Sequence, residues 1–301
     1  MAGKSILKGH LAAGTAYAIF GLNIVFCKDI AACGLVSPIA LFSLRAIGAS
    51  LLFWAISLIT PREKVAPGDL WKIAVASVLG LFVPQLTFLI ACTMTTAIDI
   101  SILSTLSPIF TMFIAALVLK EPITVKKAGG VALSFAGVLF LIFNSVVHPN
   151  GIESSKPLGI ILMLLNALSF ASYLGIFRPL IAKYSVITFM KWMFLFALLI
   201  SLPFSAADLA VTPYAAIPAN VLLEIGFLIL FATFVAYFLI PVGQKNIRPT
   251  LVSMYSYLQP IIAAIVAIAI GMDRLSWQKV LATVLVVTGV VIVNKSRAAS
   301  H

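Results

Sequence analysis

Apolar runs, each long enough to cross a bilayer, follow one another along almost the whole 301-residue chain. A transmembrane helix needs about 20 mostly apolar residues, with roughly 17 as the lower limit. Polar residues gather mainly between the runs, a pattern typical of membrane spans rather than of half-exposed helices. The predicted spans are residues 10–28, 38–59, 71–92, 97–119, 125–143, 158–181, 187–205, 219–242, 248–270 and 277–293.

Composition supports an all-α, polytopic membrane protein with ten transmembrane helices. The chain is 62% hydrophobic and 10% charged, whereas soluble domains have about 45–50% apolar and about 25% charged residues. The net charge of +11 does not indicate nucleic-acid binding, because the Lys and Arg residues punctuate apolar runs instead of forming a water-exposed basic face. We expect the lipid bilayer as a partner and no nucleic acid.

The positive charges also predict orientation. With the N-terminus inside, fourteen of the twenty Lys and Arg residues fall in cytoplasmic segments, four fall outside, and Arg45 and Lys191 lie within spans. Because positively charged loops stay on the cytoplasmic side, both termini are predicted to be cytoplasmic. The expected location is the inner, cytoplasmic membrane.

The sequence offers little for enzymatic or metal chemistry. Cys27, Cys33 and Cys92 lack metal-ligand or disulfide spacing, and the three histidines lie near span ends or in connections. Motifs for phosphate binding, zinc proteolysis and serine hydrolysis are missing from the sequence. We therefore expect no cofactor, no bound metal and no enzymatic activity.

The chain contains an internal duplication. STLSPIFTMFIAALVLKEPIT, which starts at Ser104, is matched 152 residues later by SYLQPIIAAIVAIAIGMDRLS, which starts at Ser256. Five spans per copy is an odd number, so the second copy must enter the membrane from the opposite side. We predict two inverted five-helix repeats, residues 1–147 and 148–301.

Each copy contains a proline near the start of an apolar helix. Pro108 and Pro260 each remove a backbone donor and free the carbonyl four residues earlier, on Ser104 and Ser256. In hydrocarbon a free carbonyl costs several kcal/mol unless it meets protein or water. The two helix kinks are therefore candidate walls and bending points of a cavity, or purely structural kinks satisfied by neighbouring groups.

The far ends of the two copies predict turns. Thr124 and Ser276 are favoured N-cap residues for the helices that follow. Glu121 and Asp273 then become turn or interface carboxylates.

A stripe of small residues, Ala128, Ala132 and Ala136, follows in the fifth span. Small residues let helices approach closely. We interpret the stripe as a packing face within the molecule, with a dimer contact as the alternative.

Several segments resemble a known family. IFGLNIVFCKDI (residues 19–30) is similar to the first-helix pattern of the EamA-type family in the drug/metabolite transporter superfamily. The segments that begin LSPIFTMFIAALVLKEP and LQPIIAAIVAIAIGMDR are similar to the fourth-and-fifth-helix signature and its second copy. The resemblance implies secondary transport of small metabolites, often outward, through a cavity lined by the first, third, fourth, sixth, eighth and ninth helices. Ala171 and Tyr173 depart from this pattern, where the first copy has Gly21 and Asn23.

Polar groups within spans are expensive and are therefore candidates for function. Hydrogen bonding between helices is the alternative role for each. The candidate substrate-binding residues are Asn23, Gln85, Ser101, Ser104, Asn166, Tyr173, Tyr237, Tyr255, Tyr257 and Gln259. The candidate apolar walls are Phe20, Phe88, Phe170 and Trp192.

Three charged residues, Arg45, Asp99 and Glu224, fall in the outer third of their predicted spans. They are candidate gate or coupling residues and are expected to pair with one another. Asp99 is the preferred site for a proton or a gate, with a simply hydrated carboxylate as the alternative.

These features predict a secondary active transporter, with export the expected direction. Its small-molecule substrates are expected to be amino acids or other small amphipathic metabolites, with protons as the candidate coupling ion. The alternatives are a uniporter or exchanger of the same fold, or a non-transporting membrane sensor or assembly factor. A monomer and a homodimer are both compatible with the sequence.

Overall fold

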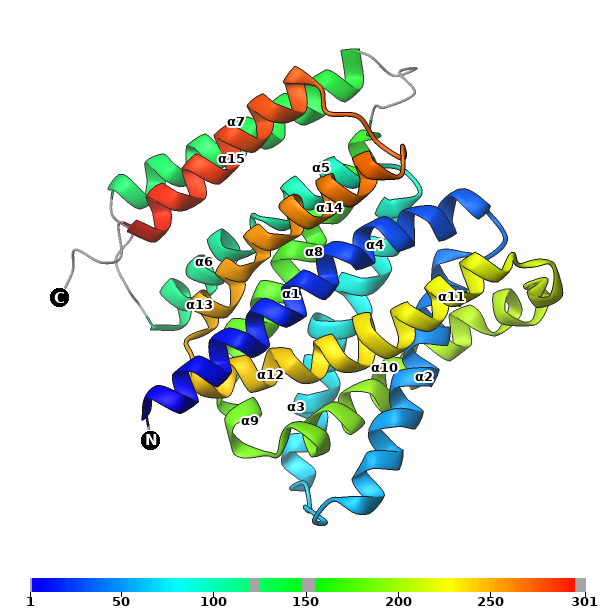
Figure 1. Cartoon of the computed structure of the whole chain (residues 1–301). Helices are drawn as coiled ribbons and strands as arrows, with labels where there is room; N and C mark the ends of the chain where they lie inside the picture. Colours follow the sequence, from blue (N-terminus) through cyan, green and yellow to red (C-terminus); the bar gives the residue numbers. More distant parts are fainter. Residues whose placement is uncertain (1, 120–124, 148–154, 296–301) are drawn as a thin grey trace.

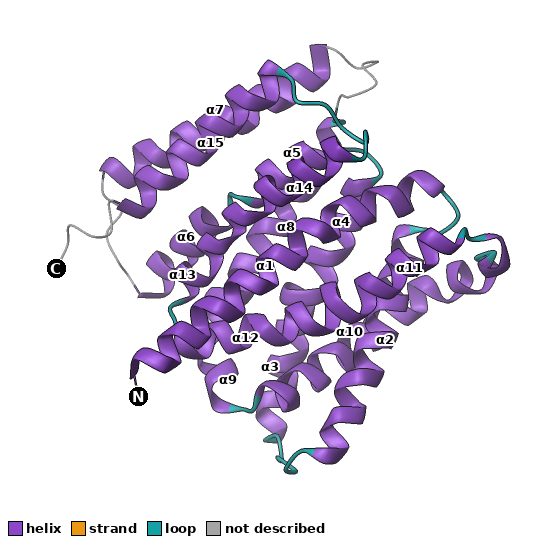
Figure 2. Cartoon of the chain, in the orientation of Figure 1, coloured by secondary structure: helices purple, strands orange, loops and turns teal. Residues whose placement is uncertain are grey.

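The computed structural model describes residues 2–119, 125–147 and 155–295, and all regular structure within these ranges is helical (Figure 2). Glu121 and Thr124 lie outside the described residues, so their predicted turn and capping roles stay predictions. Ser276 accepts a hydrogen bond from the backbone N–H of Lys279, as expected for an N-cap (3.4 Å).

The first half of the chain runs from α1 to α7. Segments α3, η1 and α4 follow one another without a loop, and η1 is a π-helical segment. The elements are α1 (Ala2–Cys33), α2 (Pro38–Ile59), α3 (Pro67–Ser77), η1 (Val78–Phe82), α4 (Val83–Cys92), α5 (Ala97–Ser104), α6 (Ser107–Leu119) and α7 (Val125–Val147).

The second half repeats this order with three extra short helical elements, α9, η2 and η4. A π-helical segment, η3, again interrupts the third long span. The elements are α8 (Pro157–Ile176), α9 (Arg178–Lys183), α10 (Val186–Val211), η2 (Tyr214–Ala216), α11 (Ala219–Phe227), η3 (Leu228–Val235), α12 (Ala236–Asn246), α13 (Pro249–Met254), η4 (Tyr255–Tyr257), α14 (Leu258–Ala269) and α15 (Trp277–Lys295).

Local sequence explains many helix starts. Ser37, Thr96 and Ser185 each accept a hydrogen bond from the backbone N–H three residues later, at 3.2 Å in all three cases. Proline occupies the first turn of α2, α3, α8 and α13, where its missing N–H and fixed φ are tolerated.

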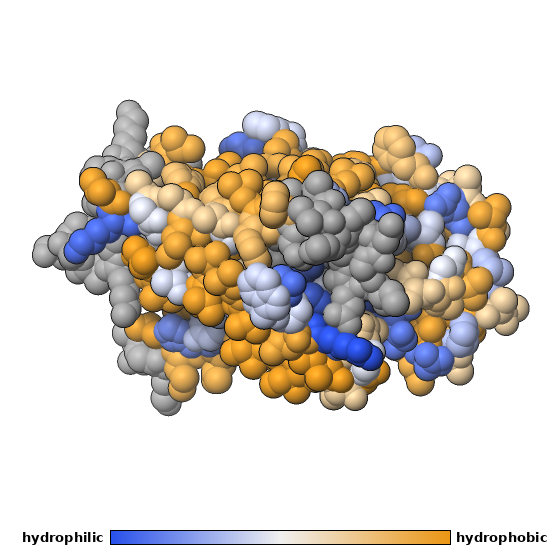
Figure 3. All heavy atoms as spheres, turned by 90° about the horizontal axis from the view of Figure 1, so that it is seen from above, coloured by the Kyte–Doolittle hydropathy of each residue, from blue (hydrophilic) through white to orange (hydrophobic). Residues whose placement is uncertain are grey.

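Eight helical segments of the described chain are long and apolar enough to cross a membrane. The fifth and tenth predicted spans have shorter apolar stretches, Ala128–Phe140 in α7 and Trp277–Ile292 in α15. Leu58 and Phe204 are examples of large apolar side chains on the surface, with relative exposures of 83% and 69%. Hydrophobic residues also dominate the face in Figure 3, as expected for a protein that meets lipid.

Helix pairing shows a twofold arrangement. α1 packs against α12 and α14, while α8, its counterpart in the second half, packs against α4 and α6. Each of the remaining pairs, α2 with α10 and α7 with α15, joins counterpart helices directly (Figure 1). This pattern is what two inverted five-helix repeats produce, so the predicted fold class is confirmed.

The prolines mark interruptions rather than bends. Thr105 and Leu106 form a turn between α5 and α6, and Pro108 is the second residue of α6. In the second half, the 3-10 turn η4 separates α13 from α14, and Pro260 is the third residue of α14. The expected single kinked helices are therefore broken in two, because the lost backbone bonds are replaced by tighter i→i+3 turns.

The pair of α7 and α15 forms one edge of the molecule (Figure 1). A Cβ atom at Gly289 would lie 2.3 Å from the carbonyl oxygen of Gly130 and 2.3 Å from Ser134 Oγ, so only glycine permits this contact. The alanine stripe at Ala128, Ala132 and Ala136 is exposed instead. Our interpretation of that stripe as an internal packing face was wrong, since Gly130, Ser134 and Gly137 form the buried face one residue or two away.

Candidate functional site

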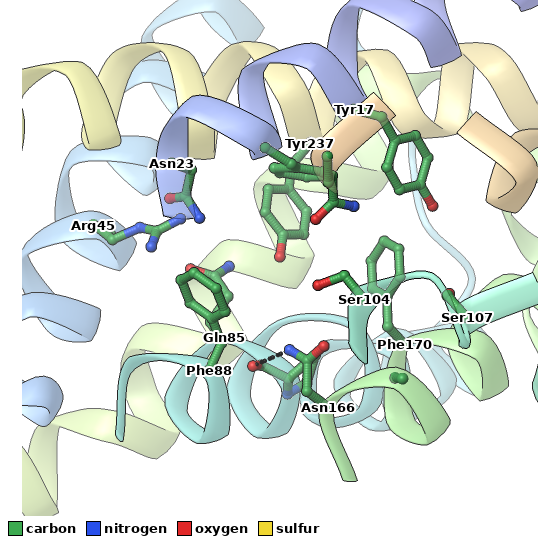
Figure 4. Close-up of a pocket in the computed structure, with 14 residues that line it drawn as sticks. Tyr17, Asn23, Arg45, Gln85, Phe88, Ser104, Ser107, Asn166, Phe170 and Tyr237 are labelled. Atoms are coloured by element: carbon green, nitrogen blue, oxygen red, sulfur yellow. Dashed lines mark hydrogen bonds between the residues drawn. The ribbon is translucent and has the colours of Figure 1, made fainter. Parts of the chain in front are cut away.

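A central cavity lies where the two halves meet. The first, third, fourth, sixth, eighth and ninth predicted spans all contribute to it, and α2 adds Arg45. Its volume is about 80 Å³, enough for several water molecules. The lining residues are Tyr17, Phe20, Asn23, Arg45, Pro84, Gln85, Phe88, Ser104, Ser107, Asn166, Ala167, Phe170, Tyr237 and Gln259 (Figure 4).

Several polar groups of the cavity wall have no protein partner. In the described part of the chain they include Tyr17 Oη and Ser107 Oγ, whereas the Gln85 amide interacts with the Tyr237 hydroxyl. An unpaired buried polar group costs about 1–3 kcal/mol. Asn166 is satisfied, because its Nδ2 donates to the carbonyl of Pro84 at 2.6 Å (Figure 4). The unpaired groups are therefore the ones available to a ligand.

Aromatic rings form the apolar part of the wall. Phe20 meets Tyr17 and Tyr237 edge to face, with ring centroids 5.7 and 5.5 Å apart. Phe170 meets Tyr237 in the same way at 6.3 Å. Phe20, Phe88 and Phe170 line the cavity, whereas Trp192, another predicted wall residue, packs against Trp54 at 5.5 Å.

Five of the predicted substrate-binding residues come together in the cavity: Asn23, Gln85, Ser104, Tyr237 and Gln259. Asn166, also a candidate, joins them. These six residues come from α1, α4, α5, α8, α12 and α14.

Other predicted binding residues do not line the cavity. Ser101 is fully buried and donates to the carbonyl of Ile98 at 2.6 Å. The Tyr173 ring lies against Gly80, where a Cβ atom would be only 2.7 Å from it. Tyr255 contacts His10 at 2.8 Å, and Tyr257 in η4 is also absent from the lining.

The second repeat has Tyr173 where the first has Asn23, and the two side chains lie in different surroundings. Asn23 in α1 faces the cavity, whereas Tyr173 at the corresponding place in α8 fills space beside η1. The two repeats therefore contribute unequal groups, and the cavity is not symmetric.

The two serines that precede the prolines also differ. Ser104 lines the cavity and donates to the carbonyl of Ile100 at 2.9 Å. Ser256 is fully buried outside the cavity lining, and its hydroxyl has no partner. Ser104, at the break between α5 and α6, therefore lines the cavity, whereas Ser256, before α14, does not.

The expected pairing of Arg45, Asp99 and Glu224 is wrong, because each meets other groups. Arg45 Nε donates to Thr233 Oγ1 at 2.8 Å and Nη1 approaches Cys27 Sγ at 3.8 Å. Asp99 accepts from Ser155 Oγ at 2.5 Å. Glu224 faces the carboxylate of Asp29.

Hydrogen bonds join the two halves at the end of the molecule that carries the N-terminus. Asp69 of α3 accepts from Lys183 Nζ (2.5 Å) and Tyr184 Oη (2.7 Å). The bond to Asp69 raises the pKa of Lys183, so this pair stays charged at neutral pH. Glu63 accepts from the backbone N–H of Ser185 at 2.9 Å.

The opposite end is joined as well. Asp273, which precedes α15, accepts from the backbone N–H of Ile98 in α5 at 3.0 Å and from Lys279 Nζ at 2.5 Å. Ser155 bonds to both Asp99 and the backbone of Thr96. The cavity thus lies between two sets of contacts that link the halves.

Four cavity residues were not predicted from the sequence: Tyr17, Pro84, Ser107 and Ala167. Tyr17 lies three residues before Phe20 and six before Asn23, so helical spacing on the face of α1 would have identified it. For Ser107, the only feature of the sequence that suggested a place in the cavity was its position next to Pro108. The paired π-helical segments, which begin at residues 78 and 228, had no sequence signal that we recognised.

The architecture and the cavity define a class: a multi-pass α-helical membrane protein whose two inverted repeats surround a central binding cavity. The chain belongs to the EamA-like transporter family, whose model matches residues 7–143 and 157–295. The chain is therefore a member of a family of membrane transporters.

Similar proteins agree with this family. An uncharacterized transporter of Archaeoglobus fulgidus is 29% identical over 152 residues, which is 50% of this chain and 51% of that protein. The chain thus spans about half the length of this relative. The uncharacterized transporter YyaM of Bacillus subtilis is 24% identical over 76% of this chain and 75% of its own. A solved crystal structure shares the fold, with a TM-score of 0.65, 17% identity and 99% coverage of both chains.

Proposed function

We propose that this protein is a secondary active transporter that exports small metabolites across the cytoplasmic membrane by alternating access. The observation that carries the proposal is the central cavity, whose wall has unpartnered polar groups and which lies between two sets of contacts linking the halves. Both termini are on the cytoplasmic side in this proposal, and residues 1–147 and 148–301 are the two moving units.

Transport requires each set of contacts to open in turn. A hydrogen bond contributes about 0.5–1.5 kcal/mol net, and charged groups about 1.5–3 kcal/mol. Opening one end therefore costs only a few kcal/mol, within the range that a ligand can shift. Inverted repeats favour this cycle, because the two open states are related by the same twofold arrangement.

Amino acids or other small amphipathic metabolites fit a cavity with amide, hydroxyl and aromatic walls. A thermal-shift screen of purified protein against a metabolite library would find ligands, and proteoliposomes would then measure flux. Net transport driven by a proton gradient supports the active mechanism. Exchange unaffected by the gradient supports a uniporter or exchanger, and the absence of any flux supports a sensor or assembly factor.

A pair of cysteine variants tests the position of the site. In a variant without native cysteines, Ser104→Cys is expected to react with a water-soluble maleimide and to be protected by a transported substrate. Ser256→Cys is the matched control, because Ser256 is equally close to its proline but buried away from the cavity lining. Two outcomes would contradict this position of the site: labelling of Ser256→Cys alone, or labelling of neither cysteine while the protein is transporting. The substrate pathway would then not pass the central cavity at Ser104.

A further inference from the structure

Arg45 carries a buried charge inside the membrane-spanning part of the protein. Its residue is 2% exposed, and the part that is exposed borders the central cavity. Thr233 and Cys27 fix the guanidinium through Nε and Nη1. Thr233 is itself anchored, because its hydroxyl donates to the carbonyl of Leu228 at 2.7 Å within the π-helical segment η3.

These contacts orient Arg45 but do not neutralise it. Neither partner is a carboxylate, because Thr233 contributes a hydroxyl and Cys27 a sulfur atom whose other polar contact is Asn23 Oδ1 (3.6 Å). Among the described residues no carboxylate lies within ion-pair distance of Arg45. The nearby acidic residues have other neighbours, with Asp99 bonded to Ser155 and Glu224 facing Asp29.

A buried charge without a counterion is strongly unfavourable. Membrane proteins keep such charges mainly where a substrate, an ion or water meets them. A guanidinium binds a carboxylate especially well, because its planar donors match the two oxygens. Arg45 is thus one half of a buried ion pair for which residues 2–119, 125–147 and 155–295 supply no carboxylate.

The surroundings of Arg45 suit the same ligand group. Figure 4 shows Asn23 beside Arg45, with Gln85 across the cavity from them. Gln85 lines the cavity as well, and its side-chain NH₂ group is a donor suited to a second carboxylate oxygen. Arg45 is the only basic side chain that the described residues contribute to the cavity lining, which matches a single negative charge.

The rest of the cavity has aromatic rings along its wall, the Ser104 hydroxyl near its middle and further hydroxyl groups at its far side (Figure 4). Phe20, Phe170 and Tyr237 supply ring faces and edges. Beyond them, Tyr17 and Ser107 present hydroxyl groups without partners (Figure 4). A ligand anchored at Arg45 would extend its apolar body between these rings.

We infer that the substrate is an organic monocarboxylate with an apolar or aromatic body, and that its carboxylate supplies the counterion of Arg45. This inference rests on the proposed transport function and adds the substrate class. Zwitterionic amino acids belong to this class through their carboxylate, whereas neutral and purely cationic metabolites do not.

The binding test compares acids with their amides. Benzoate, hexanoate and L-leucine would each be titrated against the purified full-length protein beside benzamide, hexanamide and L-leucinamide, by calorimetry and thermal shift. At least one acid is expected to bind at least tenfold more tightly than its amide. Equal binding of acids and amides, or no binding by any of the acids, would overturn the inference.

Variants locate the interaction. Arg45→Gln is expected to weaken binding of the acid at least tenfold, while Arg178→Gln, which alters an exposed arginine outside the cavity, leaves it unchanged. Asn23→Asp covers the case in which Arg45→Gln fails to fold. It places a carboxylate beside Arg45 without changing the side-chain shape, so thermal stability should rise or hold while acid binding falls at least tenfold. Acid binding that survives Asn23→Asp contradicts the proposal.

Flux measurements separate this inference from the transport function. If the protein in proteoliposomes transports a neutral or cationic compound, and Arg45→Gln transports it at the same rate, the carboxylate site is refuted. The transport function would still stand. Proteoliposomes without flux for any compound would refute the transport function itself.

Discussion

At the scale of single residues, the two carboxylate oxygens of Asp99 have different surroundings. One oxygen accepts from Ser155, and the other is buried without a partner. The residue lies in the first turn of α5, where a negative charge is favoured by the helix dipole. Two roles follow: Asp99 is the proposed proton-coupling group, or it is an anchor that ties Ser155 to α5.

Two substitutions distinguish these roles. Asp99→Asn removes the charge, whereas Ser155→Ala keeps the charge and removes the hydrogen bonds of Ser155 to Asp99 and to the backbone N–H of Thr96. If Asp99 couples protons, Asp99→Asn should lose most accumulation driven by a pH gradient but keep substrate exchange, and Ser155→Ala should transport normally. Proteoliposomes with and without the gradient measure both. Identical defects in the two variants would show that Asp99 is a structural anchor.

Polarity within a span identified most of the residues that meet in the cavity, but it did not identify their direction. Ser101 and Ser104 are one helical turn apart and carry the same hydroxyl, yet only Ser104 lines the cavity. The side that a residue faces depends on how its helix rotates against its neighbours. That rotation is a property of tertiary packing and has no signal in a single sequence.

At the scale of helices, the contact between α7 and α15 depends on close backbone approach. Gly289 meets the backbone of Gly130 and the hydroxyl of Ser134, and Ser134 Oγ also donates to the carbonyl of Val286 at 3.0 Å. Backbone atoms cannot move aside as a flexible side chain can. Any larger residue at Gly289 must therefore separate the two helices.

Gly289→Ala is expected to destabilise the protein by about 1–3 kcal/mol, the usual effect of overpacking. The matched control is Gly129→Ala in α7, where a Cβ atom would meet nothing within 4 Å. Because alanine also favours helix, the control should leave thermal stability unchanged or slightly higher. Thermal unfolding in detergent measures both, and equal midpoints for the two variants would contradict the close contact.

Helix positions followed from apolar runs, whereas their internal irregularities did not. The proline positions indicated a disturbance near Ser104 and Ser256, but a bend and a break differ by only a few backbone hydrogen bonds. The π-helical segments at Val78–Phe82 and Leu228–Val235 lie in unbroken apolar sequence. Their extra residue per turn is accommodated by neighbours such as Tyr173 against Gly80, which sequence periodicity does not register.

At the scale of the whole molecule, the twofold arrangement fixes how the chain crosses the membrane. Each half has five crossings, so the halves enter from opposite sides and the two termini lie on the same side. Figure 1 shows the first turns of α1 and the last turns of α15 toward the same end of the bundle. The duplication was sufficient to predict the inverted repeats, because it depends on long stretches rather than on single contacts, while the orientation derived from the charge count stays a prediction.

Reporter fusions test the orientation. Fusions after Arg62, Lys127 and Arg297 are expected to be cytoplasmic, and fusions after Asn150 and Asp208 to lie outside, because positive residues concentrate in the first group of segments. Alkaline phosphatase and fluorescent protein fusions report the two sides with opposite signals. A cytoplasmic signal after Asn150 together with an external signal after Arg297 would invert the proposed orientation.

The contact between Asp273 and the first turn of α5 has a consequence for biosynthesis. The carboxylate of Asp273 accepts the backbone N–H of Ile98 at 3.0 Å, one of the donors that every helix leaves open at its start. The ribosome makes residue 98 long before residue 273. When the fourth span enters the membrane, the backbone N–H of Ile98 therefore still lacks its Asp273 acceptor. The first half of a nascent chain completes this contact only after the segment between α14 and α15 has been made.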